Sequence, residues 1–94
     1  MISEIVPIEK EFIAGEKFPR EEVLFSTEAI RNRRALLQRA TLLGNAYHHK
    51  VKIIFETVAE TRIVETTIWA TDEIMISLKG GVMIPIQRIC EVVI

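Results

Sequence analysis

The chain has few of the residues that mark extracellular, fibrous or membrane proteins. Its 94 residues include one cysteine, three prolines and four glycines, and aromatic residues make up 6%. The single cysteine, Cys90, excludes a disulfide within the chain and is typical of a reducing compartment. No run approaches the roughly 18 consecutive apolar residues of a membrane helix, and no secretory leader is recognisable. We therefore expect a cytoplasmic protein with no membrane partner.

The remaining composition is that of a globular protein. Hydrophobic residues make up 49% and charged residues 27%, which is enough apolar material for a core. We expect a single domain over residues 1–94, with an N-terminal extension at 1–22, a helix at 26–45 and a β region at 48–94. A domain of this size buries a modest share of its surface, so oligomerisation would add stability.

The extension is the segment with the weakest pattern. Pro7, Gly15 and Pro19 interrupt any long helix or strand. We expect its first ten residues to be loosely held, or ordered only against a partner. The segment 19–25 has the composition of one helical turn, with the proline at its first position.

Charge is distributed unevenly along the chain. Residues 1–28 hold seven acids and three bases, residues 29–55 hold six bases and no acid, and residues 56–94 hold six acids and three bases. A central basic segment therefore lies between two acidic ones, although the net charge is only −1.

Apolar residues recur at helical spacing in the first part of this basic segment. Ser26 or Thr27 is expected to cap the helix, and Gly44-Asn45 to end it with a left-handed residue. Arg33 falls on the apolar side, where it either snorkels over the core edge or pairs with an acid of the extension. The predicted apolar stripe consists of Ala29, Leu36, Leu37, Ala40, Leu43 and Tyr47.

From His48 onward the apolar residues alternate, which predicts strands. Gly80-Gly81 suits a tight hairpin turn, and Pro85 requires an edge strand or an outward-facing amide position. The predicted strands are 51–58, 62–70, 74–79, 82–86 and 90–94. Short turns between them indicate an antiparallel meander. Because only one helix is available to cover five twisted strands, we expect the sheet to curl into a small barrel. We therefore predict a mainly β fold with one α-helix, in which five antiparallel strands form a bent sheet that closes into a barrel.

The segment "IMISLKGGVMIPIQRICEVVI", with the helix before it, resembles the Sm-like and SH3-like small barrels. The chain is also similar to short uncharacterised bacterial proteins of the Bacteroidetes type, which share "LLQRA", "VETTIWA" and "KGG" followed by "IPI". The Sm-like resemblance implies self-association through the strands at 82–86 and 90–94. It also implies RNA contacts near Asp72, which follows Trp69, and at Gln87-Arg88.

The sequence offers no pattern of residues for catalysis or metal binding. His48 and His49 are adjacent, and adjacent side chains on a strand point to opposite faces, so they cannot share one ion. Cys90 has no local base, and Gly80-Gly81 lacks the surroundings of a phosphate loop. We therefore expect no cofactor, no metal and no enzymatic activity.

Binding is the remaining class of function. Seven residues are candidates for nucleic-acid contact: Arg31, Arg34, Arg39, His49, Lys50, Lys52 and Arg88. Our first hypothesis is a small oligomerising module that binds RNA through its basic helix. The alternative is a structural or regulatory protein–protein adaptor with no nucleic-acid role, whose arginines pair with acidic surface. Self-association is expected through edge strands such as "CEVVI" or "VKIIF", and Leu42 is expected to be exposed unless a partner covers it.

Overall fold

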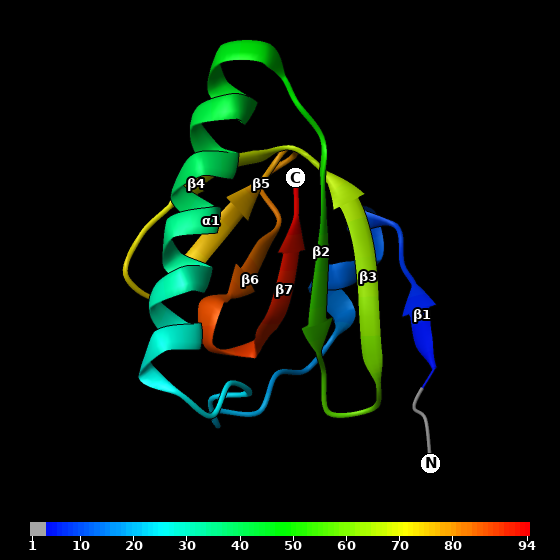
Figure 1. Cartoon of the computed structure of the whole chain (residues 1–94). Coiled ribbons are helices and arrows are strands. Elements are labelled where there is room, and N and C mark those ends of the chain that lie inside the picture. Colours follow the sequence, from blue (N-terminus) through cyan, green and yellow to red (C-terminus); the bar gives the residue numbers. More distant parts are fainter. Residues whose placement is uncertain (1–3) are drawn as a thin grey trace.

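In the computed structural model, which describes residues 4–94, two small β-sheets enclose one core and a long helix lies beside them (Figure 1). The helix is α1 (Thr27–Tyr47). The four-stranded sheet has the order β1-β3-β2-β7 and the three-stranded sheet the order β4-β5-β6. The strands are β1 (Ile5–Pro7), β2 (Val51–Glu56), β3 (Thr61–Thr66), β4 (Ile68–Thr71), β5 (Met75–Leu78), β6 (Met83–Pro85) and β7 (Ile89–Val93). Two 3₁₀ helices, η1 (Lys10–Gly15) and η2 (Ile86–Arg88), complete the described elements.

The predicted fold class is wrong. The described chain is a small mixed α/β domain in which a short strand precedes the helix, and its two sheets do not close into a barrel. The predicted strand at 62–70 is divided at Thr67, so that β3 and β4 belong to different sheets. Later in the chain, η2 lies between β6 and β7, and no strand pairing joins these two strands.

The N-terminal segment is part of the fold. β1 pairs in parallel with β3, with Ile5 opposite Thr61 and Pro7 opposite Ile63. Ile13 of η1 is 1% exposed and belongs to the hydrophobic core. The prediction of a loosely held start is therefore wrong for residues 4–10, and its first three residues lie outside the described part. The helical turn predicted at 19–25 is also absent there.

Helix α1 begins as predicted and ends differently. Ser26 caps it, because the Ser26 hydroxyl accepts a hydrogen bond from the Ala29 N–H at 3.0 Å. The left-handed residue at the other end is His48, with φ 55°, rather than Gly44-Asn45. Gly44 lies inside the helix, where a Cβ atom would stand 2.4 Å from the Ile68 carbonyl oxygen of β4. Glycine is therefore required at this position for close helix–strand packing.

The buried stripe of α1 consists of Arg33, Leu37, Ala40 and Gly44. The prediction of Leu37 and Ala40 as core residues is confirmed, and that of Tyr47 is wrong, because its exposed fraction is 76%. The stripe packs mainly on β4 and on β7. Both sheets contribute the rest of the core, including Phe55, Ile53, Ile68, Ile76, Leu78, Ile84 and Ile89.

The predictions for the Gly80-Gly81 turn and for the strand that contains Pro85 are confirmed. Gly80 and Gly81 have φ values of 92° and 84°, and their turn connects β5 to β6. β6 is an edge strand, as Pro85 predicted. β2, which contains all of "VKIIF", lies between β3 and β7 and is not an edge, whereas β7 is one.

Candidate nucleic-acid interface

Two of the seven candidate bases are engaged inside the molecule. Arg88 is buried, with its Nη1 donating to the Glu21 carbonyl at 2.7 Å and its Nε donating to the Glu56 carbonyl at 3.1 Å. Arg34 donates to the carbonyls of Asp72 and Glu73 at 3.1 and 2.9 Å. Arg88 fixes the extension onto β2, and Arg34 fixes α1 onto the β4–β5 turn. Both guanidinium groups are thus held against main-chain carbonyls of the fold.

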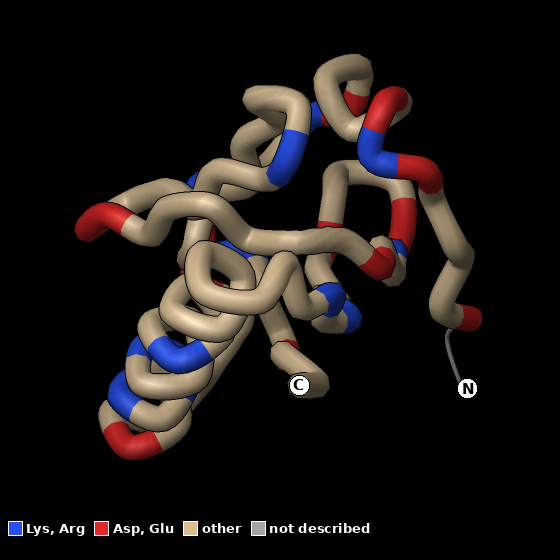
Figure 2. Tube along the Cα trace, turned by 90° about the horizontal axis from the view of Figure 1, so that it is seen from above, with Lys and Arg blue, Asp and Glu red and all other residues tan. Residues whose placement is uncertain are grey.

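Arg31 and Arg39 differ from them, since both are exposed on the outward face of α1. No salt bridge among residues 4–94 joins either of them to a carboxylate. Figure 2 shows basic bands along the helix and an acidic band in its first turn, Glu28, whereas the acidic bands near the N-terminal segments lie on the opposite side. Leu42, with an exposed fraction of 71%, lies on the same face. This face therefore combines free positive charge with an uncovered apolar side chain.

His49, Lys50 and Lys52 follow α1 and are all exposed. Lys50 and Lys52 border a depression of about 360 Å³ beside Glu9 and Glu65. Lys52 stands directly opposite Glu65 in the β2–β3 pair. Cross-strand pairs of opposite charge attract each other, so part of this positive charge is balanced locally. Arg31, Arg39 and His49 take part in no salt bridge within residues 4–94.

The junction between α1 and β2 adds aromatic rings that sequence analysis did not select. Tyr47 ends the helix with 76% of its surface exposed. The His48 ring meets the Trp69 ring edge-on at a centroid distance of 5.5 Å. Asn45 donates to the Trp69 carbonyl at 3.0 Å, which holds the end of the helix against β4. The alternation of "HHKVK" gave no signal for this cluster, because Trp69 comes from a distant strand.

The positions at which the Sm-like resemblance implies RNA contacts form hydrogen bonds within the fold. The Asp72 carboxylate accepts the N–H groups of Ile74 and Met75, both at 2.8 Å, and so closes the β4–β5 turn. These two hydrogen bonds hold the pKa of Asp72 below its usual value, although slight desolvation acts in the opposite direction. The main-chain carbonyl of Gln87 accepts the Val23 N–H at 2.9 Å.

Arg33 pairs with Glu22, an acidic residue of the extension, which is one of the two positions that the sequence predicted for its side chain. Its Nη1 and Nη2 donate to the two carboxylate oxygens of Glu22 at 2.7 and 2.6 Å, and Nη1 also donates to the Ile89 carbonyl at 3.0 Å. The residue is 6% exposed. Burial, the largest single influence, raises the pKa of Glu22, but the hydrogen bonds and charge of Arg33 together with the N–H groups of Leu24 and Val23 lower it overall. Pairing with the extension is confirmed.

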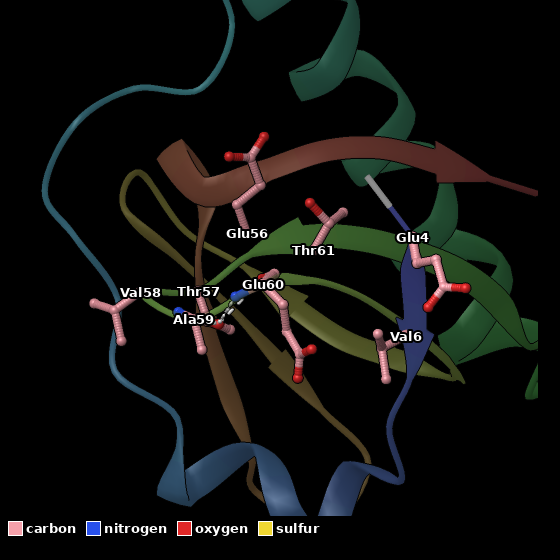
Figure 3. Close-up of a pocket in the computed structure, with 8 residues that line it drawn as sticks. All are labelled: Glu4, Val6, Glu56, Thr57, Val58, Ala59, Glu60 and Thr61. Atoms are coloured by element: carbon pink, nitrogen blue, oxygen red, sulfur yellow. Dashed lines mark hydrogen bonds between the residues drawn. The ribbon is translucent and has the colours of Figure 1, made fainter. Parts of the chain in front are cut away.

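A surface depression of about 390 Å³ lies at the β2–β3 turn and is not an evident site. Glu4, Glu56 and Glu60 line it, but their carboxylates point away from one another (Figure 3). Glu60 is paired with Arg62 at 2.7 Å, and the Thr57 hydroxyl accepts the Ala59 and Glu60 N–H groups at 3.1 Å. Nowhere in residues 4–94 do three or more His, Cys, Asp or Glu side chains gather as metal ligands.

Cys90 is held as a neutral thiol. Its Sγ donates to Glu56 Oε2 at 3.2 Å. Burial and this carboxylate together raise the pKa of Cys90 to about 12. The thiolate needed for nucleophilic attack is therefore scarce at neutral pH.

Comparison with known proteins adds no family. No family model, no curated protein and no solved structure matches this chain. The resemblance to short bacterial proteins therefore stays a prediction. Across the described residues, α1 and the 3₁₀ helices are too short or too polar to cross a membrane.

Proposed function

We propose that this chain is a binding module for single-stranded RNA. Its contact surface is the outward face of α1 together with the α1–β2 junction. The observation that supports this most is the exposed Tyr47, which the exposed His49 and Lys50 follow closely in sequence, in a stretch of chain that has no acidic residue from 29 to 55. Single-stranded RNA is bound by such surfaces because bases stack on aromatic rings while cations contact the phosphates.

The contact set is smaller than the sequence suggested. Arg31 and Arg39 supply charge along the helix, and His49 and Lys50 extend it beyond Tyr47. Arg34 and Arg88 are left out because backbone carbonyls occupy their guanidinium groups. A set this small gives a modest salt dependence, with a slope of about −0.7 per phosphate contact for a single strand.

The test is a fluorescence anisotropy titration of a labelled 12-nucleotide RNA at two salt concentrations. Binding is expected at micromolar protein and should weaken as salt rises. Tyr47→Ala should weaken binding by about tenfold through the loss of one stacked base, and Tyr47→Phe should retain it. Phe12→Ala removes another exposed aromatic ring, outside this surface, and should leave the dissociation constant unchanged.

Charge is tested in the same titration. Arg39→Gln should reduce the salt slope by about 0.7, whereas Arg20→Gln, an exposed arginine of the N-terminal segment, should not. A matching DNA oligonucleotide shows whether the 2′-hydroxyl contributes. Absence of salt-dependent binding at micromolar protein would overturn the proposal in favour of a protein–protein adaptor.

A further inference from the structure

The edge strand β7 presents unpaired backbone groups away from its own sheet. The Thr57 N–H donates to the Glu60 carbonyl at 2.9 Å, and this fixes the alternation of hydrogen bonds along β2 and β3. Phe55 and Ile53 then bond toward β3, so that Lys52 and Ile54 bond toward β7. Their partners in β7 are Val93 and Glu91, which turn their N–H and C=O groups inward.

Val92 consequently turns its N–H and C=O outward, and the N–H of Ile94 follows it. Ile89 does not follow this alternation, because the β2–β7 register shifts between Ile54 and Phe55 and places Ile89 opposite Phe55; the Ile89 carbonyl accepts Arg33 Nη1 at 3.0 Å. Arg33 thus occupies the carbonyl at the start of β7. The outward positions at Val92 and Ile94 have no hydrogen-bond partner recorded outside the ladder among residues 4–94.

β6, the edge strand that the Sm-like resemblance also implied for self-association, is poorly open to pairing. The Leu78 N–H donates to the Val82 carbonyl and the Ile86 N–H to the Ile74 carbonyl, so alternate residues of β6 bond toward β5. Met83 and Pro85 are therefore the residues that face outward, and proline has no N–H to donate. This leaves Met83 as the one outward amide donor of β6. Such an edge is poorly suited to accept another strand.

The surroundings of β7 are apolar. A depression of about 230 Å³ lies between β7 and α1, and the two residues that follow Val92 in sequence, Val93 and Ile94, are 44% and 41% exposed. Arg33 Nε lies within this region, is buried and has no acceptor among the described residues. The residues lining the depression are Leu24, Ala29, Asn32, Arg33, Leu36, Cys90, Glu91 and Val92.

We propose that the occupant of this edge is β7 of a second copy, paired antiparallel across a two-fold axis at Val93. In this register Val92 of each copy exchanges hydrogen bonds with Ile94 of the other. The Val93 side chains then meet as a non-hydrogen-bonded pair, the type with the closest side-chain contact. Glu91 stands two residues from the axis, so no like charges are placed directly opposite each other. Two four-stranded sheets become one continuous sheet.

A second copy fits this edge because the strip is complementary to itself. Its exposed side chains at the axis, Val93 and Ile94, are apolar, and each copy supplies both the donors and the acceptors. A closed two-fold pair also leaves no free β7 edge, which removes a site of uncontrolled strand addition. The surface lies on a different set of residues from the RNA contacts, so this proposal and the proposed function succeed or fail separately.

The test is sedimentation velocity over a concentration series from micromolar to millimolar. The wild-type chain is expected to shift from monomer to dimer. Val93→Lys places two ammonium groups on the axis and should raise the dimer dissociation constant about tenfold or more. Val58→Lys, on the β2–β3 turn where the side chain is 61% exposed, is the matched control and should dimerise normally.

A cross-linking experiment checks the register without disturbing charge. Val93→Cys should form a disulfide-linked dimer under mild oxidation, and Val58→Cys should not. Met83→Lys should leave the dimer intact, because β6 is not the partner. A chain that stays monomeric at millimolar concentration, or a dimer lost with Met83→Lys and kept with Val93→Lys, would overturn the proposal.

Discussion

The two faces of α1 hold the same residue type in opposite situations. On the inner face, Arg33 is 6% exposed and its guanidinium contacts Glu22 and the Ile89 carbonyl. On the outer face, Arg31 and Arg39 are exposed and have no carboxylate partner within the described residues. Position on the helix surface, rather than residue type, therefore decides which arginine stabilises the fold and which is available for binding. The inner face is also where Gly44 meets β4.

The largest expected effect on stability comes from removing the inner arginine. Arg33→Ala breaks a buried ion pair and leaves the Ile89 carbonyl without its donor, so the free energy of unfolding should fall by about 3 kcal/mol. Arg31→Ala, its counterpart on the outer face, should change it by less than about 0.5 kcal/mol. Urea denaturation monitored by circular dichroism measures both. Equal effects of the two variants would remove the distinction between the faces.

A smaller effect is expected where α1 touches β4. In Gly44→Ala the new Cβ would lie 2.4 Å from a backbone oxygen, which cannot move without shifting the strand. The free energy of unfolding should fall by about 2 kcal/mol. Gly15→Ala is the matched control, because a Cβ at Gly15 has no atom within 4 Å. If both variants unfold at the same urea concentration as the wild type, the close approach of α1 and β4 is not required.

The smallest effect is a dependence on pH. Because Arg33 and the N–H groups of Leu24 and Val23 together lower the pKa of Glu22 in the folded chain, against the effect of burial, the unfolded chain takes up the proton first as pH falls. The stability due to this pair is complete above the ordinary glutamate pKa of about 4.5 and decreases as pH falls through the lower, folded value. Wild-type stability should therefore decline more steeply below that pH than the stability of Glu22→Gln. Urea denaturation at several acidic pH values compares the slopes, and parallel slopes would contradict the pairing.

Local signals predicted the parts of the fold that depend on neighbouring residues. Ser26 as the helix cap, the Gly80-Gly81 turn and the outward position of Pro85 all follow from the conformational preferences of those residues. Features that depend on distant contacts were not predictable in this way. β1 has three residues and forms only because β3 offers a free edge, and the role of Gly44 depends on Ile68 in another element.

The residues of the candidate site also differ in whether their surroundings could be predicted from neighbouring residues. The exposure of Arg31 and Arg39 follows from the helical wheel, which is a local property. The engagement of Arg34 and Arg88 depends on carbonyls of Asp72 and Glu21, far away in the sequence. The Tyr47–Trp69 region likewise requires the register of α1 on β4, which no short pattern encodes.

The parallel pairing of β1 with β3 sets an order of events during synthesis of the chain. Ile5–Pro7 is made early, yet its partners at residues 61–63 emerge much later. Until then Ile13 has no completed core to enter, and β3, once formed, has a bare edge until β1 arrives. Docking of the first segment is consequently a late, non-local step. A nascent or partly unfolded chain that lacks it exposes a strand edge at which aggregation can begin.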